Sequence, residues 1–159
     1  MPLFSFWQGC FLAGLLLTQS VCAFERTDGV VVQCEVERNG ERRDIREVWI
    51  GYGELGERHP ELGGAAAVVR HDREGWPVIY FDKVVFSAML VSDPHMADFI
   101  FYHECAHARD SDKSEIEANC EAFLQLQQQG LMTPAKEYAL GATHRRMRGR
   151  CALCHRHNW

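Results

Sequence analysis

The first 24 residues contain no Asp, Glu, Lys or Arg, so all 39 charged side chains lie between residues 25 and 159. Beyond residue 30 the chain has no run of 18 apolar residues, which excludes a protein that crosses a membrane many times. It has no internal repeat and no low-complexity segment. Its 159 residues, 47% of them hydrophobic, exclude whole-chain disorder and predict one globular domain.

The uncharged N-terminus is typical of a secretory signal peptide. Phe11–Leu17 is an apolar run, and Val21-Cys22-Ala23 fits a small-residue cleavage pattern. We therefore predict a signal peptide at residues 1–23, cleavage after Ala23, and a mature domain at residues 24–159 that is periplasmic or secreted. Because no Lys or Arg precedes the apolar run, an uncleaved N-terminal anchor stays open. No other membrane-embedded segment is predicted.

Export changes the interpretation of the cysteines, because an oxidising compartment favours disulfides. Five cysteines remain in the mature domain: Cys34, Cys105, Cys120, Cys151 and Cys154. The odd number leaves one thiol free or in an intermolecular link. A Cys105–Cys120 disulfide is one alternative, and two buried thiols are the other. For the C-terminal pair we expect a local Cys151–Cys154 disulfide, or a disulfide from one of them to Cys34.

Charge is unevenly distributed along the chain. Residues 24–133 hold 11 basic and 21 acidic side chains, whereas residues 134–159 hold six basic and one acidic. A basic tail can contact nucleic acid or an anionic membrane. On an acidic exported domain, a solvated helix face that offsets the charge of its own domain is the better interpretation. We therefore predict no nucleic-acid partner.

The N-terminal half carries strand patterns, and the C-terminal half carries helix-capping patterns. Asn39-Gly40 predicts a hairpin turn, and the Gly-rich segment 51–64 predicts a loop. Strands are predicted at Val30–Val36, Arg43–Ile50, Ala65–Arg70 and Val78–Phe81. Helices are predicted from Asp93-Pro94 to about Arg109, from Asp112 with Glu115 as a capping box to Gly130, and from Thr133-Pro134 to about Met147. This order predicts an α+β fold: a small antiparallel sheet, a helix hairpin and a third, C-terminal helix.

Residues 103–107 read His-Glu-Cys-Ala-His, the HExxH pattern. Positions i and i+4 of a helix lie on one face about one turn apart, so His103 and His107 can bind one metal ion. Glu104, beside the first His, can serve as a general base.

A catalytic zinc site needs a third protein ligand. The two predicted helices are joined by a very short turn, so they should pack antiparallel. Glu115 in the first turn of the second helix then faces His107, and Asn119 comes level with His103. Glu115 is therefore the predicted third ligand. The Asn119 side-chain oxygen is predicted to accept a hydrogen bond from His103, which would orient the imidazole.

His103–His107 followed by Glu115-Ile116-Glu117-Ala118-Asn119 resembles the gluzincin metallopeptidases. The sequence looks most like small bacterial proteins of this group in which a strand like Gly75–Phe81 precedes the HExxH helix. This resemblance covers roughly residues 65–130. The resemblance implies a minimal zincin-like domain with a Zn²⁺ cofactor, His103, His107 and Glu115 as ligands, and Glu104 as base. Asn119 stands where Asp is commoner in this group.

The implied reaction is metal-assisted hydrolysis of a peptide or protein substrate. A peptide would pair with a strand edge near Val78–Phe81. An oxyanion-stabilising group is also expected, and the candidates from the sequence are His95, Tyr102, Tyr138 and His144. His59 and His71, in or beside loops, are interpreted as surface residues. The sequence contains no signal for a particular oligomeric state.

Two alternatives stay open. One is a metal-binding relative without activity that works as an interaction module. The other comes from Cys151-Ala152-Leu153-Cys154-His155, which matches the CxxCH pattern of c-type haem attachment. A second zinc site formed by Cys151, Cys154, His155 and His157 is a further interpretation of this tail.

Overall fold

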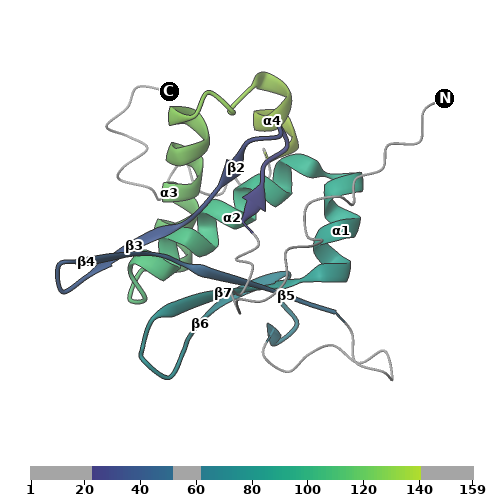
Figure 1. Cartoon of the computed structure of the whole chain (residues 1–159). Coiled ribbons are helices and arrows are strands. Elements are labelled where there is room, and N and C mark those ends of the chain that lie inside the picture. The colour runs from purple at the N-terminus through teal and green to yellow at the C-terminus, as the bar shows by residue number, and fades with distance from the viewer. Residues whose placement is uncertain (1–22, 52–61, 141–159) are drawn as a thin grey trace.

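The computed structural model describes residues 23–51 and 62–140. Within them the fold is α+β, as predicted (Figure 1). The strands are β1 (Phe24–Glu25), β2 (Val31–Val32), β3 (Glu35–Arg38), β4 (Glu41–Asp44), β5 (Arg46–Ile50), β6 (Ala67–His71) and β7 (Pro77–Asp82). The helices are α1 (Lys83–Ser92), α2 (Pro94–Arg109), α3 (Glu115–Gln128) and α4 (Pro134–Ala139). None of the helices in these described ranges is long and apolar enough to cross a membrane.

The strands form two antiparallel pairs, β1–β2 and β3–β4, and a three-stranded sheet in the order β5-β7-β6. The predicted strand Arg43–Ile50 is divided at the buried Ile45, whose N–H donates to the Cys34 carbonyl at 2.7 Å. Before this point β4 completes the predicted hairpin with β3. After it β5 runs parallel to β7, while β6 is antiparallel to β7. The predicted sheet thus contains one parallel strand pair.

The core lies between the three-stranded sheet and α2. Side chains alternate along β5, and Trp49 stacks on Phe81 of β7 with ring centroids 4.5 Å apart. Phe86 of α1 and Phe24 of β1 pack edge to face at 6.0 Å, and Phe24 stacks on Phe101 of α2 at 4.5 Å. This aromatic cluster fixes α2, the helix of the HExxH pattern, against the sheet.

Helix α1 was not among the predicted elements. It begins directly after β7, where the Asp82 carboxylate accepts hydrogen bonds from the N–H groups of Val84 and Val85, both at 3.0 Å. An N-cap of this kind satisfies the otherwise unpaired donors of the first turn. Among its residues only Phe86 is buried, so the hydrophobic pattern of the helix is weak.

Helix α2 agrees with its prediction, with Asp93 as N-cap, Pro94 at the first position and Arg109 at the end. The predicted start of the next helix at Asp112 is wrong. Ser114 is the N-cap of α3, and it forms a capping box with Glu117. The Ser-x-x-Glu pair satisfies two backbone N–H groups reciprocally, which explains why the helix begins there. The predicted end of the last helix, near Met147, lies outside the described residues.

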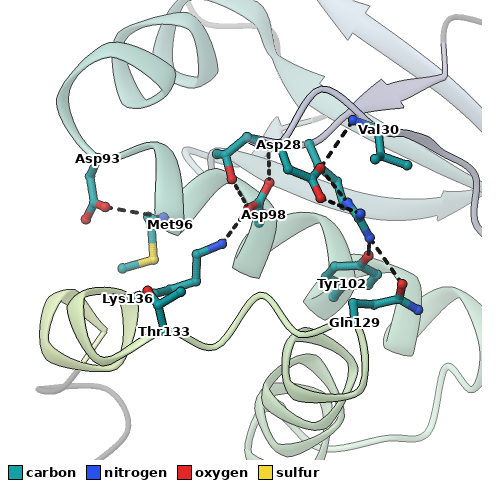
Figure 2. A network of polar contacts seen from close by, with 11 residues as sticks. Asp28, Val30, Asp93, Met96, Asp98, Tyr102, Gln129, Thr133 and Lys136 are labelled. Atoms are coloured by element: carbon teal, nitrogen blue, oxygen red, sulfur yellow. Dashed lines mark hydrogen bonds and ion pairs between the residues drawn. The ribbon is translucent and has the colours of Figure 1, made fainter.

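Polar contacts fasten the N-terminal segment to the helices (Figure 2). Arg26 donates to the Tyr102 hydroxyl of α2 at 3.2 Å and forms an ion pair with Asp28 at 2.6 Å. The Asp98 carboxylate, fully buried in α2, accepts from Thr27 Oγ1 at 2.6 Å and from Lys136 Nζ of α4 at 2.7 Å. The segment that follows Phe24 is therefore held in one position on α2.

The cysteine pairing differs from both predicted alternatives for Cys105. Cys105 forms a disulfide with Cys34, with Cα atoms 5.7 Å apart, and not with Cys120. Cys105 lies about 200° around α2 from His103, so it points away from α3 when the histidine faces it. Cys120 is also disulfide-bonded, and its partner lies outside the described residues. The predicted link from Cys34 to the C-terminal pair is likewise wrong.

Candidate metal centre

Helices α2 and α3 bring the three predicted ligands together. His103 Nε2 lies 3.2 Å from Glu115 Oε2, and His107 Nε2 lies 3.4 Å from Glu115 Oε1. One donor atom from each residue falls within 4.8 Å of the other two. The three side chains could therefore hold one metal ion.

The two imidazoles are largely buried, with 13% and 17% of their side chains exposed, whereas 79% of the Glu115 side chain is exposed. His107 Nε2 is buried and completes no hydrogen bond with any described group. A buried polar atom without a hydrogen bond destabilises the fold unless a ligand or ion occupies its lone pair. This atom faces the point shared with His103 and Glu115.

Asn119 lies one turn beyond Glu115 on α3 and contacts the other nitrogen of His103. Its Oδ1 is 2.9 Å from His103 Nδ1. Because a carbonyl oxygen only accepts, the imidazole donates through Nδ1 and presents the Nε2 lone pair to Glu115 and His107. This is the arrangement expected of a metal-binding histidine and its supporting oxygen.

The electrostatic environment favours a neutral imidazole at His103. Burial lowers its pKa most, the nearby His107 lowers it further, and Glu115 and Asn119 oppose the change. A neutral imidazole is the form that binds a metal ion.

Glu104 follows His103 on α2 and is 8% exposed. Burial, followed by the nearby Glu115 carboxylate, raises the pKa of Glu104 to about 7. A hydrogen bond from the Val69 backbone N–H and the charge of Arg70 oppose this increase. Two carboxylates beside two histidines form an environment that a bound cation would stabilise.

The four side chains lie in a cleft of about 530 Å³ between β6, α2 and the start of α3. The β6 wall and the residues before it supply Ala65, Ala66, Ala67, Val68, Val69 and His71. The helical wall includes Phe99, and Ser111 lies at the turn between α2 and α3.

The predicted binding strand needs a correction. Val78–Phe81 lies in β7, the central strand, whose two edges are occupied by β5 and β6. Within the described residues, β5 and β6 are the two edge strands of this sheet, and it is β6 that lines the cleft. The hydrophobic pattern of the sequence predicted the positions of β6 and β7 along the chain. It did not indicate which of the two lies at the edge of the sheet.

The predicted oxyanion-stabilising residues do not line the cleft where they are described. The Tyr102 hydroxyl accepts from Arg26, and His95 Nδ1 is buried elsewhere without a described partner. The side chain of Tyr138 and all of His144 lie outside the described residues. His71, interpreted from the sequence as a surface residue, lines the cleft. Its signal was its position two residues after Val69, on the same face of a strand.

Comparison of the chain with protein-family models, with curated proteins and with solved structures finds no match. The predicted signal peptide and the CxxCH tail lie outside the described residues.

Proposed function

We propose that this protein is an exported zinc metallopeptidase of the gluzincin type. The observation that carries the proposal is the convergence of His103, His107 and Glu115 donor atoms within 4.8 Å, beside a buried Glu104 in a cleft along a sheet edge. The gluzincin-like HExxH…ExxAN sequence supports the same interpretation.

Two imidazole nitrogens, one carboxylate and an open side towards the cleft fit the ligand set of a catalytic zinc site. When bound there, zinc polarises a carbonyl group and lowers the pKa of water. The exposed Glu115 would bind the metal ion from the cleft side, and the two largely buried histidines would bind it from α2.

Glu104 is the proposed general base. Its carboxylate would accept a proton from the attacking water and donate it to the leaving amine. Its place on α2, one residue from His103, puts it in the cleft with the ligands. The hydrogen bond from Val69 links this carboxylate to the strand on the opposite wall.

The proposed substrate is an extended peptide that pairs with the β6 edge. A strand edge offers backbone N–H and C=O groups to an added strand, and the small Ala65, Ala66 and Ala67 leave room beside it. His71, at the end of β6, is our candidate for stabilising the oxyanion, because it lines the cleft and the described candidates His95 and Tyr102 do not.

Hydrolysis of a peptide library by the exported protein and three variants tests this function. We expect Glu104→Gln to lower kcat by at least about a hundredfold while zinc is retained. His71→Ala should lower kcat by about tenfold or more with little change in KM. Glu121→Gln, which alters a carboxylate of α3 bonded to Arg109 and Lys113, is the matched control and should be fully active.

A second candidate function is a zinc-binding interaction module without hydrolytic activity. The neutral Asn119 beside His103, where a carboxylate is commoner in the gluzincin-like pattern, favours this alternative. The same experiment distinguishes the two: zinc in the wild type with no cleavage of any library peptide would support the module and overturn the peptidase.

A further inference from the structure

The proposed reaction gives no role to one carboxylate in the core, that of Glu47. Glu47 lies on β5 opposite Ile79 of β7, two residues before Trp49 and on the same face of the strand. That face packs against the aromatic cluster, and Glu47 is 6% exposed. Both of its carboxylate oxygens are buried and complete no hydrogen bond with a described group.

Carboxylates this deeply buried are rare unless they are paired, because burial strongly disfavours the charged form. Burial raises the pKa of Glu47 to about 8, and among the described residues the backbone N–H of Phe24 is the group that opposes this increase. The Glu47 carboxylate therefore lies beside the Phe24 nitrogen without completing a hydrogen bond to it.

That nitrogen belongs to the residue that follows the predicted cleavage point. The Phe24 ring is 2% exposed and packs against Phe81, Phe86 and Phe101. On its other side the chain is held to α2 through Arg26 and Thr27 (Figure 2). The Phe24 nitrogen is therefore fixed beside Glu47 by contacts that do not involve residues before it.

We propose that the α-ammonium group of Phe24, created by cleavage after Ala23, is the partner of the Glu47 carboxylate. A leader peptidase would hydrolyse the Ala23–Phe24 amide with one water, leaving a carboxylate on Ala23 and a protonated amine on Phe24. Processing then replaces one backbone N–H with three charged donors and completes a buried ion pair. This inference rests on the proposed export and not on the zinc site.

The consequence is a core that distinguishes processed from unprocessed chains. Removing one partner of a buried ion pair leaves an uncompensated charge, which is strongly destabilising. In a chain that retains residues 1–23, the Phe24 nitrogen is an uncharged amide. Removing the Glu47 carboxylate from that chain therefore leaves no uncompensated charge.

The test combines Glu47→Gln with the processing state of the full-length exported chain. The N-terminus of the mature protein is first determined by intact mass and N-terminal sequencing. Stability to denaturant is then measured for the processed chain and for a cleavage-blocked chain carrying Ala23→Leu, each with and without the Glu47→Gln substitution. Zinc content is measured separately, so a failure of the metal site does not affect the result.

We expect mature protein beginning at Phe24. In it Glu47→Gln should lower the folding equilibrium constant on the order of a hundredfold, whereas in the cleavage-blocked chain it should leave the constant unchanged or raise it. An N-terminus at another residue, or the same decrease in both chains, would overturn the proposal.

Amine labelling of the wild type decides the matter if the variant does not fold in either chain. The reference is a processed chain that begins one residue earlier, at Ala23. In the native protein the Phe24 amine should react at least about tenfold more slowly than the amine of this reference chain, because an ion-paired ammonium is a poor nucleophile. Equal labelling rates would contradict the ion pair.

Discussion

Asn119 shows how one side chain outside the proposed ligand set can orient a candidate metal ligand. Its Oδ1, 2.9 Å from His103 Nδ1, fixes both the tautomer and the orientation of that imidazole. The carboxamide is neutral, so it supports the histidine through geometry more than through charge.

We predict that Asn119→Ala weakens zinc affinity by about tenfold to a hundredfold, because His103 loses its orienting acceptor. Asn119→Asp should retain or strengthen affinity, since a carboxylate accepts the same hydrogen bond. Competition with a chromophoric chelator measures both. Unchanged affinity in the alanine variant would contradict the role given to this residue.

Glu47 predicts a pH dependence of stability in the cleavage-blocked chain. Its pKa is raised from 4.5 to about 8 in the folded state, so the folded state favours the protonated form. Its contribution is fully present below about pH 4.5 and is lost as pH rises towards about 8. The free energy of unfolding should fall by up to a few kcal/mol over this range. Denaturant titrations at several pH values should show that Glu47→Gln reduces this slope, while the part due to Glu104, whose pKa is raised to about 7, remains. A slope that Glu47→Gln leaves unchanged would assign it to other groups.

Single-residue predictions succeeded where helical periodicity alone determines position. His103, His107, Glu115 and Asn119 meet because residues one turn apart share a helix face and a short turn forces two helices to pack antiparallel. The partner of Cys105 could not be predicted in this way. Cys34 lies 71 residues away on another element, and such a contact depends on tertiary packing.

At the scale of elements, the start of α3 determines where the proposed third ligand lies. Ser114 is the N-cap and Glu115 is the first helical residue, so the capping box and the proposed metal ligand are adjacent. The Ser114 and Glu117 contacts, at 2.9 and 3.3 Å between backbone nitrogens and side-chain oxygens, hold this first turn.

We predict that Ser114→Ala lowers the free energy of unfolding by about 1 kcal/mol, the usual effect of losing a capping side chain. Zinc affinity should fall as well, because a frayed first turn no longer holds Glu115 in place. Denaturant unfolding and chelator competition give the two values. Ser92→Ala in α1, which does not line the cleft, is a matched control for stability that should not change zinc affinity. A fall in affinity of the same size in both variants would contradict the local explanation.

Two features of the elements lay beyond the sequence patterns. Helix α1 buries only Phe86 and follows β7 without a loop, so neither periodicity nor a turn signal marked it. Strands β5 and β7 pair in parallel although β6 lies between them in the sequence. Local hairpin signals contain no information on such a strand order. The confirmed α+β class rested on stronger, purely local signals.

At the scale of the whole molecule, α2 is the element to which the others are fastened. The Cys34–Cys105 disulfide joins it to the segment before β3, and the aromatic cluster joins it to the sheet. Asp98 joins it to the N-terminal segment and α4 (Figure 2). The proposed metal ligands His103 and His107, on its other face, therefore lie on a well-supported helix.

We predict that Cys34→Ala combined with Cys105→Ala lowers the free energy of unfolding by about 2–5 kcal/mol, the usual effect of removing a native disulfide. Because Cys105 points away from the cleft, zinc should still bind at temperatures where the variant is folded. Thermal unfolding with and without a chelator tests both statements. Loss of zinc from a fully folded double variant would contradict the separation of the two faces of α2.

The binding of one zinc ion by His103, His107 and Glu115 is the claim on which the proposed function depends. The most direct test is the metal content of exported wild-type protein beside His103→Ala and Glu115→Gln, with Glu121→Gln as the control, together with an absorption spectrum. We expect one zinc per chain in the wild type and the control, loss of zinc in the two ligand variants, and no haem absorption. Absence of zinc from the wild type, or zinc that persists in both ligand variants, would contradict this claim.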